Sequence, residues 1–257
     1  MFSCKTRPPA LSSLVAAACA IWIAGLVAPA AAQTECPSTG SAVELNMLRG
    51  SDDKSRIGAA GALVGQWRTS MPRVMAELKA FKGPTENWSL DAQFYFVALT
   101  DVLRTIVSNN VEAIGLFRAC DDPKIVRPLV WAARNVSNSS ARINATLVLG
   151  NIVDNTTVCF VLHHLRDPKI SINGRANLLG VTLAMAGYAY EENAKAIEDT
   201  IAIVQRNIST VQMDLTQTQK LIADIGARVR SSANRNTPLP PSLREPCASY
   251  GYSRDLE

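Results

Sequence analysis

The chain has 257 residues, of which 47% are hydrophobic and 19% are charged, so it is long enough to bury a sizeable core and too apolar to be disordered throughout. Its 26 Lys and Arg residues against 22 Asp and Glu residues give a net charge of only +4. Because nucleic-acid-binding proteins normally concentrate basic charge on one face, this near balance gives no reason to expect a nucleic-acid partner.

Residues 1–32 have the three parts of an export signal. A basic start is followed by an uncharged apolar run, Leu11–Val27, and then by small residues. We predict cleavage after Ala32, which makes the mature protein periplasmic or secreted, with residues 33–54 as an N-terminal linker. The alternative is a retained membrane anchor, because the apolar run approaches the roughly 17 to 25 residues that span a bilayer.

The sequence Asp-Pro-Lys-Ile occurs at residues 122–125 and again, 45 positions later, at residues 167–170. Apolar residues at helical spacing precede each copy, and a similar stretch ends at Pro84, so we predict short amphipathic helices that stop at proline. Further helices are predicted between these stops, one of them with Ser89 as its N-cap. They span Ser55–Trp67, Ser89–Val107, Ser139–Val153 and Ser171–Gly187.

Residues 158–187 read VCFVLHHLRDPKISINGRANLLGVTLAMAG: a helix, an Asp-Pro turn, an arginine in the next helix and a small, Leu-rich face. This stretch resembles a unit of the HEAT-like helical-repeat proteins, whose units are about 40 to 47 residues long. The resemblance covers residues 55–189, is closest in residues 156–187, and is disturbed in the middle unit by Pro128. It implies an α-solenoid, and because such arrays generally bind proteins and only a minority are enzymes, it implies a protein-interaction role.

Four cysteines follow the signal and allow three disulfide pairings in an oxidising compartment: Cys36, Cys120, Cys159 and Cys247. In helices stacked one repeat apart, Cys120 and Cys159 would be separated by more than the roughly 7 Å that a disulfide allows between Cα atoms. We therefore predict a disulfide between Cys36 and Cys247, which lie in proline-flanked segments. Cys159, inside the apolar VCFVL, can equally be a small buried hydrophobic residue.

Residues 190–230 have a different pattern, in which apolar residues recur in steps of four and three. The pattern predicts a long helix with a coiled-coil seam, through which residues 197–229 would pair with a second copy in a homo-oligomer. The alternatives are a long capping helix that packs on the last repeat, or two helices broken near Asn207. The seam consists of Ile197, Ile201, Val204, Ile208, Val211, Leu215, Thr218, Ile222, Ile225 and Val229. Residues 231–257 are rich in Pro, Ser and Asn and predict a flexible tail.

Few residues suggest chemistry. His163 and His164 are adjacent in a predicted helix, so their side chains diverge by about 100° and cannot chelate one metal; we interpret them as a solvated or interface pair. The paired acids Asp52 and Asp53 are interpreted as helix-capping residues. Three tryptophans near predicted helix ends are interpreted as core residues or, alternatively, as aromatic anchors of a binding face: Trp67, Trp88 and Trp131.

The sequence thus predicts an all-α protein, with a short HEAT-like stack over residues 55–189 followed by a long C-terminal helix or coiled coil. No catalytic, cofactor-binding or metal-ligating set of residues is predicted, and no cofactor. The expected function is a non-catalytic scaffold for protein partners, with a membrane involved only if the signal is retained. The alternative is an envelope enzyme or a small-ligand-binding protein with a pocket in the stack. Convergent polar groups with shifted pKa values in a concavity would favour an enzyme.

Overall fold

The computed structural model describes residues 43–50, 52–83, 87–120, 123–134 and 138–241. These residues are all-α, as predicted, and the described part of the chain contains no strand. The helices are α1 (Val43–Leu48), α2 (Asp53–Gly65), α3 (Trp67–Leu78), α4 (Leu90–Asn109), α5 (Val111–Ala119), α6 (Pro123–Arg134), α7 (Ser139–Ile152), α8 (Asn155–Arg166), α9 (Ile172–Met185), α10 (Glu191–Arg206) and α11 (Leu215–Ser231).

Side-chain caps explain where several of these helices begin. At the start of α4, Ser89 Oγ accepts a hydrogen bond from Ala92 N at 3.2 Å, which confirms the predicted N-cap. At the start of α9, Ser171 Oγ accepts from Gly174 N at 3.0 Å. Asp52 caps α2 in the same way, as predicted for this acid. Each bond satisfies an amide that the first helical turn leaves without an internal partner.

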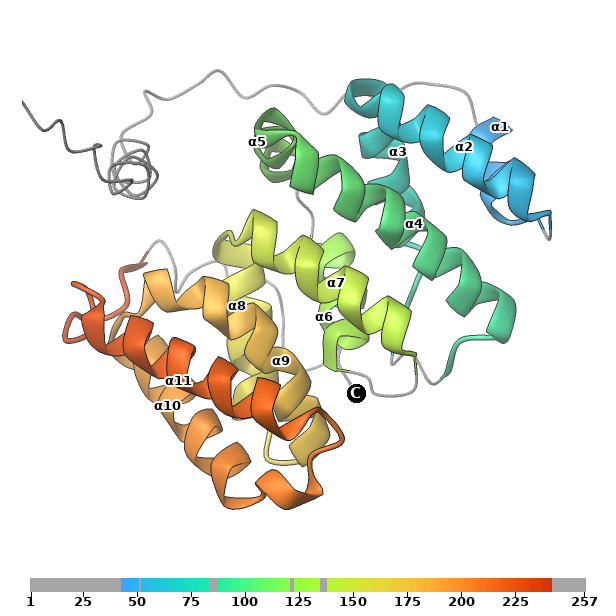
Figure 1. The fold of residues 1–257 in the computed structure, drawn as a ribbon. Helices are drawn as coiled ribbons and strands as arrows, with labels where there is room; N and C mark the ends of the chain where they lie inside the picture. The colour runs from blue at the N-terminus through green and yellow to red at the C-terminus, as the bar shows by residue number, and fades with distance from the viewer. Residues whose placement is uncertain (1–42, 51, 84–86, 121–122, 135–137, 242–257) are drawn as a thin grey trace, which may run out of the picture. The chain divides into compact units, whose positions relative to one another are not determined.

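The helices form two layers (Figure 1). α2, α4, α7, α9 and α11 lie side by side in chain order in one layer, and α3, α6, α8 and α10 follow one another in the second. α5 is an additional helix that contacts α3, α4 and α7. Apart from this insertion the chain alternates between the layers, so each helix buries its apolar face against both its own layer and the other one.

The two Asp-Pro-Lys-Ile copies have different structures. Residues 123–125 form the first turn of α6, whereas residues 168–170 belong to the connection between α8 and α9. In this connection Lys169 N donates to Asp167 Oδ1 at 2.8 Å. Proline is favourable both in the first turn of a helix and in a turn, so the repeated tetrapeptide does not mark equivalent positions in two units.

α9 is buried on most of its surface because α6, α7, α8, α10 and α11 all contact it. The Arg175 guanidinium donates to the carbonyls of Leu165 and Asp167, which the C-terminal end of α8 leaves open. On the side that faces α7, a Cβ atom on Gly180 would lie 2.7 Å from Thr146 Cγ2. The small residues of this segment therefore permit close approach of two helices.

The predicted long C-terminal helix is wrong. α10 ends at Arg206, a 3₁₀ turn follows over Ile208–Thr210, and α11 begins at Leu215. The break lies at Asn207, where the two-helix alternative predicts it. Asp214 gives α11 its own start, because its side chain accepts a hydrogen bond from Gln217 N at 2.8 Å.

The predicted seam residues pack inside the chain rather than along one continuous helix. Five are buried in an apolar cluster that includes residues of α9: Ile197, Val204, Ile222, Ile225 and Val229. Ile201, Ile208 and Val211 pack against this cluster, and Thr218 is buried. Of the predicted seam, only Leu215 is among the exposed large hydrophobic residues. The seam residues therefore cover the end of the helical stack.

Parts of the predicted linker and tail are folded. α1 lies inside the predicted linker, residues 33–54, and its Leu45 and Leu48 are buried. Beyond α11, Leu239 is buried and its N–H donates to Glu192 Oε2 at 2.7 Å, so the start of the tail packs on α10. The predicted signal and the rest of the tail lie outside the described residues. Within the described ranges, no helix is long and apolar enough to cross a membrane.

Candidate functional site

A cleft of about 870 Å³ lies where the segments that follow α1 and α3 meet the first turns of α4. This volume is typical of sites that enclose a small molecule. Its walls combine aromatic rings with charged side chains from helices that are distant in sequence. Residues that line it include Arg49, Arg56, Glu77, Phe81, Lys82, Trp88, Asp91, Phe94 and Tyr95.

An aromatic cluster supports the cleft. The ring centroid of Phe81 lies 4.9 Å from that of Trp88, 5.1 Å from that of Phe96 and 6.3 Å from that of Tyr95. Such tilted and edge contacts are favourable for aromatic rings. Phe96 is fully buried and lies outside the cleft lining, whereas Phe94 lines the cleft and is 56% exposed. The cluster thus gives the cleft an apolar wall, and Phe94 adds an accessible ring to the lining.

Hydrogen bonds fix the position of Trp88. Its indole Nε1 donates to the carbonyl of Lys82 at 3.0 Å, and Gln93 Nε2 donates to the carbonyl of Trp88 at 3.1 Å. Because Ser89 is the N-cap of α4, the backbone next to Trp88 is held as well. The ring is therefore positioned before any ligand arrives.

Arg49, Glu77 and Tyr95 form a hydrogen-bonded group in the cleft wall. Arg49 Nη2 donates to Glu77 Oε2 at 2.8 Å, and the Tyr95 hydroxyl donates to the same oxygen at 3.0 Å. The Arg49 guanidinium lies 4.1 Å from the centre of the Tyr95 ring, a cation–π contact. The Arg49 side chain is still 57% exposed. Since a guanidinium carries five N–H donors, Arg49 retains donors for a ligand.

Burial chiefly raises the pKa of Tyr95 to about 12. The contact with Tyr95 and the bond to Glu77 raise the pKa of Arg49 above its ordinary value. At neutral pH, Tyr95 is thus a hydrogen-bond donor and Arg49 a cation. A general base needs a pKa near the working pH, so neither group is suited to take a proton from a substrate. Both are suited to binding.

The other charged residues of the cleft are Arg56, Lys82 and Asp91. Arg56 is paired with Asp53 on its own helix. Asp91 lies in the first turn of α4, where the helix dipole favours a negative charge. The cleft therefore has three cations and two anions, and one of the anions, Glu77, already accepts two hydrogen bonds. The balance is slightly positive.

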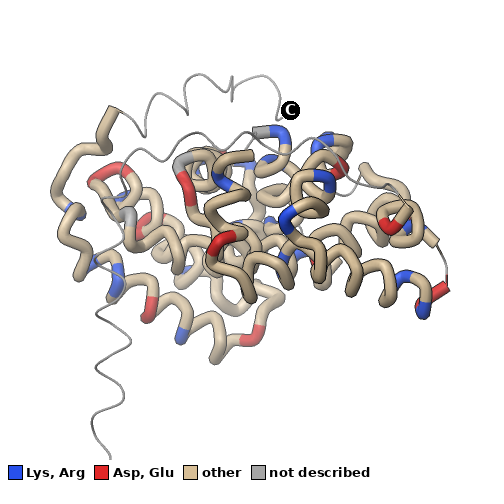
Figure 2. The backbone as a smooth tube through the Cα atoms, turned by 90° about the horizontal axis from the view of Figure 1, so that it is seen from above, with Lys and Arg blue, Asp and Glu red and all other residues tan. Residues whose placement is uncertain are grey.

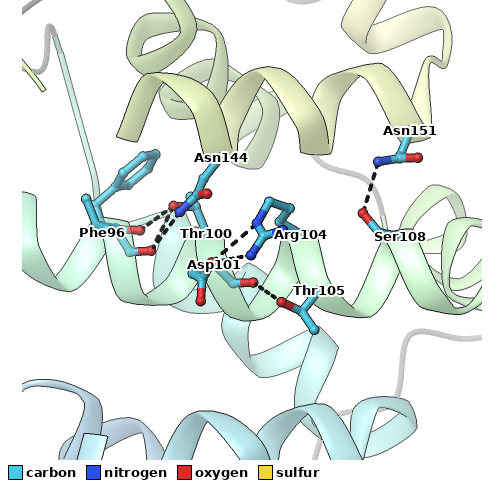
Figure 3. Close-up of polar contacts among 9 residues, drawn as sticks. Phe96, Thr100, Asp101, Arg104, Thr105, Ser108, Asn144 and Asn151 are labelled. Atoms are coloured by element: carbon cyan, nitrogen blue, oxygen red, sulfur yellow. Dashed lines mark hydrogen bonds and ion pairs between the residues drawn. The ribbon is translucent and has the colours of Figure 1, made fainter. Parts of the chain in front are cut away.

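The boundary between α4 and α7 carries polar contacts of another kind (Figure 3). Asn144 Nδ2 donates to the carbonyl of Val97, and Asn151 Nδ2 to the hydroxyl of Ser108, each at 3.4 Å, which joins the two helices. The remaining polar residues drawn there bond within α4: Thr100, Asp101, Arg104 and Thr105. Because these groups satisfy one another, we interpret the boundary as structural.

Of the two interpretations of the histidine pair, solvated or interface, the solvated one is wrong for His164, which is 1% exposed and lies on α8 where α6 packs against it. Arg134 Nη1 lies 2.6 Å from His164 Nδ1. Arginine can only donate, so Nδ1 accepts and the neutral ring carries its proton on Nε2. Burial, the charge of Arg134 and the neighbouring His163 lower the pKa of His164 to about 3. The rings of the two histidines are nearly perpendicular, at 88°, as their spacing predicts.

Cys120 and Cys159 are both buried, and the sulfurs of both are disulfide-bonded. The interpretation of Cys159 as an unbonded small hydrophobic residue is therefore wrong, although it does lie in the apolar core. Cys36 and Cys247 lie outside the described residues, so the disulfide predicted between them stays a prediction.

Sequence reasoning found one residue of the cleft, Trp88, as a candidate aromatic anchor. It missed Arg49, Glu77, Phe94 and Tyr95. A signal was present in the run Phe94-Tyr95-Phe96, because three successive residues of a helix point about 100° apart and cannot all face one core. The other two predicted tryptophan positions, Trp67 and Trp131, lie outside the cleft lining.

Basic and acidic residues are interspersed along the described chain (Figure 2). Among these residues no group of three or more His, Cys, Asp or Glu side chains could hold a metal ion. Comparison of the chain with protein-family models, with curated proteins and with solved structures gives no match. The cleft, with its aromatic rings and exposed arginine, is thus the feature from which a function can be argued.

Proposed function

We propose that the protein is an exported, non-catalytic interaction protein built on HEAT-like helical repeats, and that the cleft holds part of a protein partner. The observation that carries this proposal is the combination of an exposed Phe94, a fixed Trp88 and an arginine stacked on Tyr95. Tryptophan, tyrosine and arginine are the residues that most often dominate binding energy at protein interfaces.

Two observations support the HEAT-like part of the proposal. The chain alternates between two layers of helices, which is how helix pairs stack in such arrays. The connection from α8 to α9 has an Asp-Pro turn, and Arg175 of the following helix bonds to the carbonyl of Asp167. The inserted α5 and the different structure of the first Asp-Pro-Lys-Ile copy make the array irregular.

Export is supported by the composition of residues 1–32 and by the disulfide-bonded Cys120 and Cys159, since disulfides persist in oxidising compartments. The mass of the mature chain recovered from a periplasmic extract tests this part. We expect the mass of a chain that begins at Gln33. A chain that retains residues 1–32 and remains with the membrane would instead establish the anchor.

Affinity capture tests the interaction role. The mature protein is tagged and incubated with periplasmic extract, and bound proteins are quantified by mass spectrometry. We expect Phe94→Ala and Arg49→Gln to recover at least tenfold less of the main partner than the unchanged protein. Ile143→Ala is the matched control, because Ile143 is 52% exposed on α7 and outside the cleft lining. Equal recovery by all variants would refute the role of the cleft.

Self-association through residues 197–229 stays a prediction, although the burial of Ile225 and Val229 favours an internal role for the seam. Light scattering on the protein with and without the double change Ile201→Asp and Ile208→Asp decides between an oligomer interface and an internal cap. A change from oligomer to monomer at unchanged stability would establish the oligomer. A monomer that loses stability on this change would establish the seam as an internal cap.

A further inference from the structure

We propose that the cleft recognises an apolar side chain and a carboxylate on the same residue, as the C-terminal residue of a partner chain presents them. This inference rests on the proposed function and specifies its ligand. The apolar part would contact Phe94 and Trp88, and the carboxylate would accept hydrogen bonds from Arg49.

The donor geometry of Arg49 points to a carboxylate. One of its N–H groups is bonded to Glu77 Oε2 at 2.8 Å, and one face of the guanidinium lies on the Tyr95 ring at 4.1 Å. These two contacts fix the plane of the guanidinium, and the side chain is still 57% exposed. A fixed guanidinium edge matches the two oxygens of a carboxylate better than it matches a neutral carbonyl.

The cation and the apolar surface belong to one cleft, because Arg49, Trp88 and Phe94 all line it. A series of ring contacts joins them: the Arg49 guanidinium lies 4.1 Å from the centre of the Tyr95 ring, which lies 6.3 Å from that of Phe81, and Phe81 lies 4.9 Å from Trp88. A ligand that carries both a carboxylate and an apolar side chain can therefore meet both kinds of surface within this cleft. Lys82 adds positive charge to the lining, whereas the charge of Arg56 is balanced by its pair with Asp53.

Asp91 opposes this preference and so provides a test of it. Its carboxylate lines the cleft and would repel an anionic ligand. We expect Asp91→Asn to strengthen the binding of a carboxylate severalfold at low salt, since charge interactions near the surface are screened by salt. A neutral ligand should show no such change.

Two small probes that differ only in charge test the proposal: N-acetylphenylalanine, which has a carboxylate, and its amide. Binding to the mature protein is followed by NMR through the indole N–H of Trp88, which is bonded to the Lys82 carbonyl; Trp88→Phe identifies the resonance. We expect the acid to bind about tenfold or more tightly than the amide, and Arg49→Gln to remove this difference.

Arg68→Gln is the matched control. Arg68 also lies over an aromatic ring, that of Trp67 at 4.5 Å, and is paired with Glu112, but it is outside the cleft lining. We expect no change in probe binding. Circular dichroism and thermal unfolding of both arginine variants establish that they fold. Arg49→Lys keeps the positive charge but cannot donate two parallel hydrogen bonds to a carboxylate, so it should bind the acid with intermediate affinity.

A third probe, N-acetylglutamylphenylalaninamide, carries its carboxylate on the neighbouring side chain. Equal binding of this probe and the acid would overturn the assignment to a terminal residue. Equal binding of acid and amide, or no shift of Trp88 at tens of millimolar of either, would overturn the carboxylate preference. If Phe94→Ala still abolishes partner capture in that case, the interaction role stands and only the ligand class is wrong.

Discussion

Acid should destabilise this protein through His164. Burial, the charge of Arg134 and then His163 lower the pKa of His164 to about 3 in the folded state, against about 6.5 in an unfolded chain. The unfolded state therefore binds the proton more strongly, and the contribution of His164 is complete above pH 6.5 and is lost as the pH falls towards 3. At pH 4.5, two units below the unfolded value, the loss from His164 alone is about 3 kcal/mol.

Urea unfolding at pH 7, 6, 5 and 4.5 measures this loss. In His164→Gln the amide oxygen can still accept from Arg134, but the side chain does not titrate, so the fall in the free energy of unfolding between pH 7 and 4.5 should be smaller by about 3 kcal/mol. His163→Gln is the control, because His163 is half-buried and should contribute less. If the unchanged protein and His164→Gln lose the same stability over this interval, the assignment of a buried neutral His164 is refuted.

Three further changes test the packing. Ile225→Ala, at a fully buried seam position, should lower the free energy of unfolding in urea by about 2 to 5 kcal/mol. Leu215→Ala, at a half-exposed seam position, should change it by less than about 0.5 kcal/mol. Equal effects would contradict the internal role of the seam. Gly180→Ala, whose Cβ would lie 2.7 Å from Thr146 Cγ2, should destabilise the protein by about 1 to 3 kcal/mol. Gly115→Ala, where a Cβ on α5 would meet open space, should stabilise it by about 1 kcal/mol. If thermal unfolding shows Gly180→Ala to be the more stable variant, the close contact of α7 and α9 is refuted. Arg175→Met leaves the carbonyls of Leu165 and Asp167 without their donors and should cost about 1 to 3 kcal/mol, and amide exchange at the end of α8 should accelerate; unchanged exchange would show that these bonds do not hold the turn.

Helices could be predicted from the sequence because their signals are local. Ser89 and Ser171 cap the helices that they precede, and the apolar spacing of residues 89–107 corresponds to α4. The sequence predicts the break at Asn207 only as one of three alternatives, because the apolar residues continue at steps of four and three on both sides of it. The periodicity of a sequence does not report whether the backbone is helical throughout, and the cap at Asp214 decided the outcome.

The cleft could not be predicted in the same way, because its parts come together only through tertiary packing. Arg49 and Glu77 are 28 positions apart, and Tyr95 is a further 18 along the chain. Each of these residues is ordinary in its local context: an arginine after a short helix, a glutamate in a helix and a tyrosine in an aromatic run. The burial of His164 has the same origin, since Trp131 and Arg134 of α6 contact its ring only through tertiary packing.

The cleft lies at the first turns of α4, where two faces of the helix have different surroundings. Tyr95 and Phe96 are buried there, and Tyr95 bonds Glu77 of α3. Leu90 and Phe94 lie in the same turns but are 66% and 56% exposed. The first turns of α4 thus carry apolar side chains into solvent next to a packed aromatic core and the exposed Arg49. A surface of this kind is stable in water when it is small and when a partner can cover it.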